Sequence, residues 1–91
     1  MIEGELQVSN GLGLHARAAA RLVHLLKSYR SEVWLSRPDR NGRADARSII
    51  SLIGLGATCG TRLRFDISGA DETETLHAIR SLFDSGFGES S

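Results

Sequence analysis

His15 and Arg17 are the two residues whose types and spacing are best suited to chemistry. They lie two positions apart in "GLHAR", where a glycine-containing loop gives way to a helical pattern that starts at Ala16. The first turn of a helix offers unpaired backbone N–H groups and the positive end of the helix dipole, and both attract anions. The same field disfavours a protonated imidazole, so we expect His15 to be neutral and nucleophilic near neutral pH. Such a histidine can attack a phosphoryl group, which the backbone N–H groups of Ala16 and Arg17 and the Arg17 guanidinium would then bind.

Two other interpretations of this stretch stay open. Gly11, Gly13 and Ala16 match the G-x-G-x-x-A spacing of a dinucleotide-binding turn. That fold needs several parallel βαβ units, however, and 91 residues hold at most half of one, so the spacing alone is weak evidence. His15 could also be an exposed helix cap without chemistry. In the phosphoryl-binding interpretation, the two glycines give the loop the freedom to adopt positive φ angles and keep side chains away from the ring.

The remaining polar residues predict no second site of chemistry. His24 and His77 fall within helical segments, without the spacing of metal ligands, and we interpret them as ordinary helix residues. Cys59 is the only cysteine, so it can form neither an internal disulfide nor a cysteine metal cluster, which fits a reducing compartment. We therefore expect a site that uses no metal and no cofactor.

Hydrophobic periodicity divides the chain into four strands and three helices. Alternation typical of strands covers residues 2–9, 31–36, 43–45 and 61–68, and helical spacing covers residues 16–28, one or two turns within 47–56, and 71–84. Ser48 is a suitable N-cap for the short middle helix, although the composition of that segment also suits a strand. Asp71, followed three residues later by Glu74, resembles a capping box at the start of the last helix.

This order of elements, βαββαβα, predicts an α+β fold. Each strand has one apolar face and each helix has one apolar stripe. A four-stranded, mostly antiparallel sheet with helices on one face buries all of them. A chain of 91 residues is long enough for one core, so we expect a single domain over residues 1–91.

Composition and charge exclude several classes of protein. No segment approaches the roughly 20 apolar residues of a membrane span, and the first residues lack a signal-peptide pattern, so we expect a cytoplasmic protein without membrane insertion. Residues 15–64 contain ten Lys and Arg but only three Asp and Glu. This excess suits an acidic partner protein or a phosphorylated group. The chain has few aromatic residues and none interleaved with a basic run, which argues against nucleic acid.

Three blocks of the sequence resemble the HPr family, the histidine phosphocarriers of the bacterial phosphoenolpyruvate-dependent phosphotransferase system. They are "GLHAR" after a strand, then "RSIISLIGLGATCG", then "TRLRFDISG" before a closing helix with an acidic start. The resemblance covers about residues 5–88, and "NGLGLHARA" and "LFDSGFGE" look more like the nitrogen-related NPr branch than the sugar-transport branch. It implies an open-faced β-sandwich of four antiparallel strands covered on one face by three helices, in agreement with the element order.

The resemblance also implies roles for individual residues. His15 matches the histidine that takes a phosphoryl group on Nδ1 from enzyme I and passes it to a IIA protein, as a stoichiometric carrier rather than an enzyme. Arg17 matches the arginine that assists transfer, and Ser48 matches the serine that a dedicated kinase/phosphorylase modifies in some members. We expect a monomer whose docking surface includes apolar residues and arginines: Leu14, Ala18, Ala19, Arg21, Arg47, Leu52, Ile53 and Leu55.

Position 18 departs from the family pattern, which usually has proline there. Ala18 restores a backbone N–H and a free φ in the first helical turn. We expect transfer to survive this change, while its rate and the stability of the phosphohistidine stay open.

A different class of function is also open: a regulatory binding module that keeps the fold and signals to partner proteins through phosphorylation of His15 or Ser48. A small phosphate-handling enzyme that uses His15 and Arg17 is a third.

Overall fold

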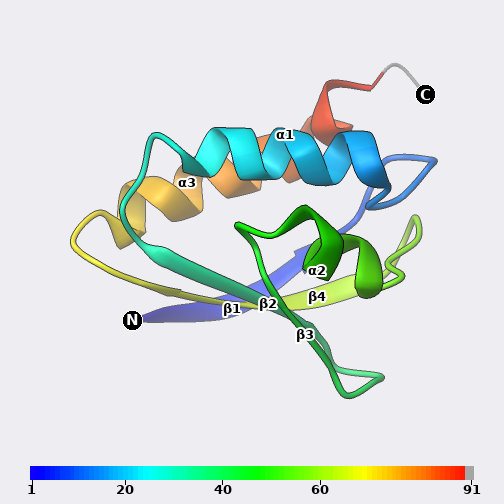
Figure 1. The fold of residues 1–91 in the computed structure, drawn as a ribbon, viewed down its shortest axis with the longest axis horizontal. Helices are drawn as coiled ribbons and strands as arrows, with labels where there is room; N and C mark the ends of the chain where they lie inside the picture. Colours follow the sequence, from blue (N-terminus) through cyan, green and yellow to red (C-terminus); the bar gives the residue numbers. More distant parts are fainter. Residues whose placement is uncertain (90–91) are drawn as a thin grey trace.

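The computed structural model describes residues 1–89, and its elements follow the predicted order with one addition (Figure 1). The strands are β1 (Ile2–Gln7), β2 (Glu32–Arg37), β3 (Gly42–Asp45) and β4 (Arg62–Ser68), and the helices are α1 (Ala16–Leu26), α2 (Ile49–Gly54) and α3 (Glu72–Asp84). The addition is η1 (Gly86–Gly88), a single 3-10 turn that follows α3. The segment around α2, whose composition also suited a strand, is therefore a helix.

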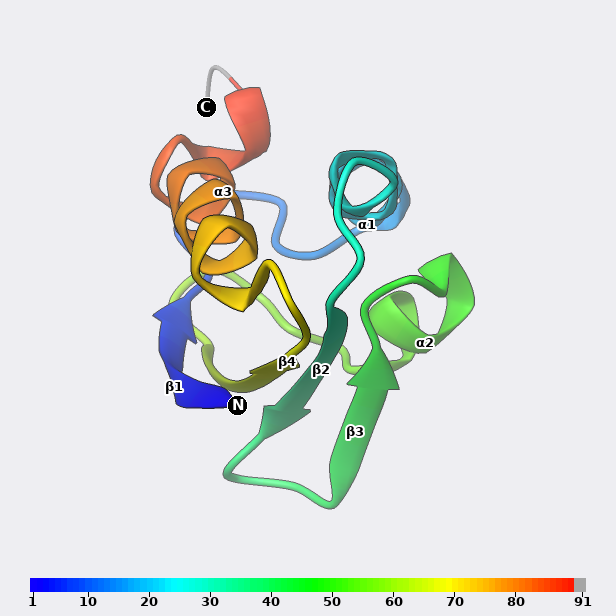
Figure 2. The ribbon, with the colours of Figure 1, turned by 90° about the vertical axis from the view of Figure 1, so that its left-hand side faces the viewer.

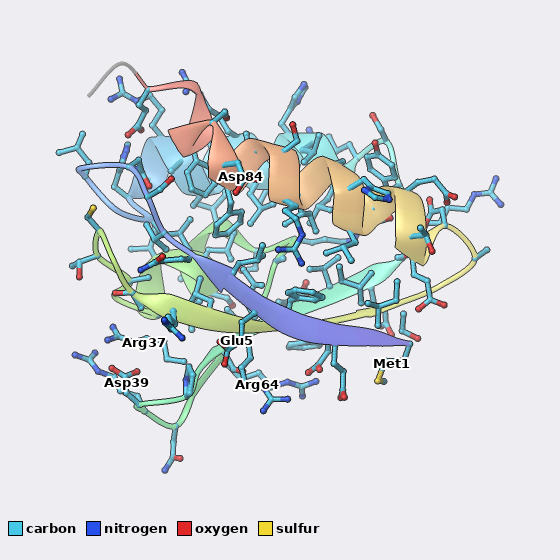
Figure 3. All side chains as sticks on the ribbon, turned by 180° about the vertical axis from the view of Figure 1, so that it is seen from behind. Met1, Glu5, Arg37, Asp39, Arg64 and Asp84 are labelled. Carbon is cyan, nitrogen blue, oxygen red and sulfur yellow. The ribbon has the colours of Figure 1, made fainter. Side chains whose placement is uncertain are left out.

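The four strands form one antiparallel sheet in the order β1-β4-β2-β3. Leu6 of β1 lies opposite Leu63 of β4, and both are buried on the face that the three helices cover (Figure 2). Glu5 lies opposite Arg64, and both side chains point away from the helices on the open face of the sheet (Figure 3). The predicted open-faced α+β fold is confirmed. A sheet without parallel pairs contradicts the dinucleotide-binding interpretation, which depends on parallel βαβ units.

The hydrophobic core lies between the sheet and the helices. Helix α1 contributes Ala18, Ala19, Leu22 and Leu26 to it, all with no exposed surface. A Cβ added to Gly4 of β1 would lie 2.6 Å from the Cζ atom of Phe65, so the aromatic ring occupies the space where a side chain would be. These contacts join the first strand, the first helix and the central strand β4 in one packed unit.

Helix α1 ends at Leu26, two residues before the predicted end, and a distant arginine binds the carbonyl groups at this end and in the loop that follows. Nη1 of Arg47 donates to the carbonyl of Leu26 at 2.8 Å, and Nη2 donates to the carbonyls of Tyr29 and Ser31 at 2.9 Å each. A positive charge at a helix C-terminus also interacts favourably with the helix dipole and stabilises the helix. Arg47 is thus a structural cap for α1.

The predicted capping box at the start of α3 is wrong. Asp71 is the N-cap residue, but its side chain makes no cap hydrogen bond. Its carboxylate instead accepts hydrogen bonds from the Ser31 hydroxyl at 2.5 Å, the Ser31 N–H at 3.0 Å and the Arg30 N–H at 2.8 Å. These bonds, led by the Ser31 hydroxyl, lower the pKa of Asp71 to about 2. Asp71 therefore ties the start of α3 to the loop between α1 and β2.

Arg37 holds the segment that follows α2. Its Nη1 donates to the carbonyls of Leu55 and Gly56 at 3.1 and 2.9 Å, and its side chain is 9% exposed. Asp39 pairs with the same guanidinium at 2.8 Å, at the turn between β2 and β3 (Figure 3). The pair fixes the chain just before Ala57, which contacts the loop that carries His15.

Candidate functional site

His15 is the N-cap residue of α1, and the helix start orients its imidazole. The backbone of His15 is extended, with φ −82° and ψ −178°, and its carbonyl accepts a hydrogen bond from the Ala19 N–H at 2.8 Å. Its side-chain Nδ1 accepts a hydrogen bond from the Arg17 N–H at 3.2 Å. An N-cap side chain normally satisfies one of the unpaired N–H groups of the first turn in this way. Nδ1 therefore faces the positive end of the helix.

The loop before His15 has its shape because Gly13 packs against another loop. Gly13 has φ +72°, and a Cβ there would lie 2.5 Å from the carbonyl oxygen of Ala57 and 2.9 Å from Cα of Thr58. The next residue, Leu14, donates its N–H to the same Ala57 carbonyl at 2.9 Å. Only glycine fits a position with both constraints. Of the two glycines that give this loop its freedom, Gly13 has a positive φ and Gly11 does not.

Glu89 is a part of the site that the sequence patterns did not indicate. Its Oε2 lies 2.5 Å from Nε2 of His15, and its side chain is only 5% exposed. Asn10 donates from Nδ2 to the other carboxylate oxygen at 2.9 Å and to the Gly13 carbonyl at 2.7 Å. Arg17 adds its Nε at 3.8 Å from the carboxylate. The carboxylate thus has three partners, all from the loop and helix start around His15.

The hydrogen bonds define which nitrogen of His15 carries the proton. The bond from Asn10 most of all, and the contact with His15, lower the pKa of Glu89 against the opposing effect of desolvation, so Glu89 is ionised at neutral pH. An ionised carboxylate only accepts hydrogen bonds, so Nε2 of His15 is the donor in their contact. A backbone N–H only donates, so Nδ1 is the acceptor from Arg17. His15 therefore carries its proton on Nε2 and a lone pair on Nδ1.

Glu89 reaches His15 through the C-terminal strap, residues 85–89, which folds back after α3. Phe87 has φ +59°, an uncommon value for a residue other than glycine, and it lies between two glycines that also have positive φ. Its ring is fully buried and packs against Phe83, with the centroids 4.8 Å apart and the ring planes tilted by 56°. Nη1 of Arg21 donates a hydrogen bond to the carbonyl of Phe87. In the sequence, the only signal for this strap is an aromatic residue between two glycines, directly after a helix.

Arg17 completes the arrangement on the solvent side of His15. Its side chain is 62% exposed, so the guanidinium can move to an anion that arrives at Nδ1. The predicted phosphoryl-binding groups, the N–H groups of Ala16 and Arg17 and this guanidinium, therefore lie together at the start of α1. Such a set can bind a tetrahedral anion next to a nucleophilic nitrogen.

Most of the predicted docking residues belong to the core, so that prediction is wrong for them. The buried members are at most 5% exposed: Leu14, Ala18, Ala19, Leu52 and Leu55. The periodicity of so short a helix as α2 did not indicate which of its apolar residues face the sheet. The two predicted arginines are exposed, and each also makes a hydrogen bond within the fold, Arg47 to the Leu26 carbonyl and Arg21 to the Phe87 carbonyl. Ile53, at 42% exposed, is the one apolar member that lies at the surface.

The exposed apolar surface lies on other residues of α2 and beside α1. Ile49 and Ile50 are 38% and 84% exposed, which together with Ile53 gives α2 an outward apolar face. Leu12, in the loop before His15, is 61% exposed. A groove of about 420 Å³ runs along α1, and its lining comes from Arg17, Ala20, Arg21, His24, Leu25 and Leu82. The sequence prediction therefore included one of the three exposed isoleucines of α2, Ile53, and missed Ile49 and Ile50.

Ser48 is the N-cap of α2, as predicted. Its Oγ accepts a hydrogen bond from the Ser51 N–H at 3.3 Å. It precedes the exposed Ile49 and Ile50, so any change of charge at Ser48 falls next to the outward apolar face of α2.

Two classes of feature are absent from residues 1–89. No group of three or more His, Cys, Asp or Glu in this part of the chain could hold a metal ion. In the same residues, no helix has both the length and the apolar character that crossing a membrane requires.

Comparisons with known proteins identify the family of the chain. Residues 2–85 match the family model described as the phosphorylation site of the phosphotransferase HPr component. The chain is 42% identical over 89 residues to a phosphocarrier protein HPr of Xylella fastidiosa, with 98% of each chain covered, and 38% identical over 88 residues to a phosphocarrier protein NPr of Klebsiella oxytoca, with 97% covered. A crystal structure of HPr from Thermoanaerobacter tengcongensis superposes with a TM-score of 0.89 at 32% identity, over the whole of both chains. The chain therefore belongs to the HPr family of phosphocarrier proteins of the phosphotransferase system.

Proposed function

We propose that His15 accepts a phosphoryl group on Nδ1 from a phosphohistidine of enzyme I and passes it to a histidine of a IIA protein. The observation that carries this proposal is the state of Nδ1, which has a lone pair at the N-terminus of α1 with an exposed arginine beside it. Membership of a phosphocarrier family supports the same chemistry. The chain then acts as a stoichiometric carrier rather than as a catalyst.

The transfer step needs no metal and no proton transfer at His15. The Nδ1 lone pair attacks the phosphorus atom of the donor phosphohistidine, a new N–P bond forms, and the electron pair of the broken bond returns to the donor nitrogen. The His15 ring gains positive charge while it keeps the proton on Nε2. In the second transfer, a histidine of the IIA protein attacks the same phosphorus, and the electron pair of the broken bond returns to Nδ1.

The bound phosphoryl group takes over the groups that surround Nδ1. The Arg17 N–H, which now donates to Nδ1, becomes free to donate to a phosphoryl oxygen when Nδ1 is bonded to phosphorus. The N–H of Ala16 and the Arg17 guanidinium supply further charge-assisted hydrogen bonds. These contacts are moderate in number, which suits a carrier that must release the group again.

The outward face of α2 serves as the docking surface. The exposed apolar area comes from Ile49, Ile50 and Ile53, and the exposed Arg17 lies in the first turn of α1, close to His15. Apolar residues with a charged rim are typical of transient interfaces. The excess of arginine in the middle of the chain favours partners with an acidic surface around the reacting histidine.

Ser48 is a candidate for modification by a serine kinase/phosphorylase. A phosphate on this N-cap residue would add negative charge beside Ile49 and Ile50, within the proposed docking face. Docking to an acidic partner would weaken by like-charge repulsion. The carrier would then be controlled at its interface rather than at His15.

We place the carrier in the cytoplasm and expect it to act as a monomer. His15, Asn10, Arg17 and Glu89 all come from one chain, so the site is complete without a second copy. The partners that supply and remove the phosphoryl group must reach the same exposed Nδ1 in turn.

The intact mass of the protein tests this function. After incubation with phosphoenolpyruvate and enzyme I, the protein should gain the mass of one phosphoryl group, and acid should remove it. The His15→Ala variant should gain nothing, while the Ser48→Ala variant should gain the same mass as the unaltered protein. Steady release of many phosphate molecules per chain would instead indicate a phosphate-handling enzyme.

A further inference from the structure

The second nitrogen of His15 has a partner that the carrier mechanism does not require. Glu89 lies at the end of the C-terminal strap, 74 positions from His15, and its Oε2 is 2.5 Å from Nε2. We propose that Glu89 is a positioning residue for His15: its carboxylate keeps the proton on Nε2 and balances the positive charge that the ring acquires on phosphorylation. This inference rests on the proposed phosphorylation of Nδ1.

The burial of Glu89 shows that this carboxylate is held in place by the fold. A carboxylate that is only 5% exposed loses most of its hydration, which costs free energy unless hydrogen bonds replace the water. Here Asn10, itself buried, binds one oxygen and His15 binds the other. The carboxylate therefore has its partners in place before any phosphoryl donor arrives.

The strap supplies the rigidity that a positioning residue needs. The buried Phe87 ring anchors the strap on Phe83, and the Arg21 side chain binds the Phe87 carbonyl on the other side. Asn10 connects the strap with the His15 loop, because its Nδ2 donates both to Glu89 and to the Gly13 carbonyl. These contacts hold the backbone of the strap, and the bonds to Asn10 and His15 hold the carboxylate itself.

The charge balance explains why a carboxylate suits this position better than a neutral acceptor. Nδ1 loses its lone pair when it bonds to phosphorus, so the ring becomes cationic while Nε2 remains protonated. An ionised Glu89 then faces a cation, and their hydrogen bond becomes charge-assisted. In metal sites, a carboxylate often accepts a hydrogen bond from the second ring nitrogen of a ligating histidine. Its loss typically lowers the metal affinity or the activity by about 10- to 100-fold.

Two variants separate the effect of charge from the effect of contact. Glu89→Gln keeps the size and an acceptor oxygen but removes the charge, and Glu89→Asp keeps the charge on a shorter side chain. We expect Glu89→Gln to slow phosphoryl transfer from phosphorylated enzyme I by about tenfold, and Glu89→Asp to retain more of the rate than Glu89→Gln. Glu74→Gln, which alters an exposed carboxylate in the first turn of α3, is the matched control and should leave the transfer rate unchanged.

The tautomer of His15 gives a second measurement that does not depend on transfer. In the unphosphorylated protein, ¹⁵N chemical shifts should show a protonated Nε2 and an unprotonated Nδ1, and the Glu89→Ala variant should show a detectable fraction of the form with the proton on Nδ1. Unchanged shifts in Glu89→Ala, together with an unchanged transfer rate in Glu89→Gln, would overturn the role of Glu89. A wild-type protein that takes up no phosphoryl group would instead contradict the proposed function itself, so the two failures are distinguishable.

Discussion

Nε2 of His15 and the carboxylate of Glu89 are 2.5 Å apart, although 74 positions separate the two residues in the chain. The contact joins the N-terminus of the first helix to the strap that follows the last helix. It leaves Nδ1 as the nitrogen for which we propose phosphorylation. The proposed site is therefore built from segments that are far apart in the sequence.

Gly13 should be intolerant of a side chain. Replacement by alanine places a Cβ 2.5 Å from the Ala57 carbonyl oxygen at φ +72°, so we expect a loss of more than about 1 kcal/mol in the free energy of unfolding. The same change should displace His15 and slow phosphoryl transfer. Urea denaturation and the rate of phosphorylation by enzyme I measure the two effects.

Gly54 is the matched control for this variant. A Cβ at Gly54 has nothing within 4 Å, and its φ lies outside the left-handed region. Gly54→Ala should leave the stability unchanged or raise it by up to about 1 kcal/mol. An equal loss of stability in both variants would contradict the packing of Gly13 against Ala57.

The hydrogen bonds that Ser31 donates to Asp71, here called the clasp, should make the free energy of unfolding depend on pH in the acidic range. The hydrogen bonds lower the pKa of Asp71 to about 2, so the folded state favours the ionised carboxylate more than the unfolded state does. The resulting stabilisation is fully present above about pH 4 and should be lost as the pH falls from about 4 to 2.

Urea midpoints measured over this range test the clasp. The midpoint of the wild-type protein should fall toward low pH, and the Asp71→Asn variant should have a lower midpoint at neutral pH and a smaller fall over the same range. A variant with the same acid dependence as the wild type would show that other carboxylates cause it.

The proposed docking face of α2 should be sensitive to charge. Ile50 is 84% exposed, so Ile50→Asp should change the free energy of unfolding by no more than about 0.5 kcal/mol. The affinity for enzyme I or for the IIA protein should fall by about tenfold or more, because a carboxylate replaces apolar contact area in the interface. Titration calorimetry with each partner measures the change.

Thr73→Asp adds the same charge at an exposed position of α3 and is the control for the docking face. It should leave both affinities unchanged. A similar loss of affinity in Thr73→Asp and Ile50→Asp would indicate a general effect of net charge rather than a contact through α2.

The order of elements was predictable because each strand and helix has its own apolar period. The strands β2 and β4 begin and end within one residue of the predicted bounds, since alternation ends where the turn residues begin. The end of α1 was less predictable, because Arg47, more than twenty positions away, binds the carbonyl of its last residue, Leu26. Asp71 shows the same limit, because its carboxylate is bound by Ser31 of another loop rather than by its own helix.

Half of the site could be predicted in the same way. His15 and Arg17 are neighbours in the sequence, and a helix start has a known effect on both. Glu89 could not be predicted, because its position depends on the positive φ of Phe87 and on burial of that ring against Phe83. No local pattern encodes where such a strap will pack.

The measurement that tests the central claim most directly is the identification of the phosphorylated atom. The protein is labelled with ¹⁵N in its histidines, phosphorylated with phosphoenolpyruvate and enzyme I, and examined by ¹⁵N and ³¹P NMR. We predict one phosphoryl group, with phosphorus coupled to Nδ1 of His15 and a proton retained on Nε2. Coupling to Nε2, or phosphorylation of a residue other than His15, would contradict the account.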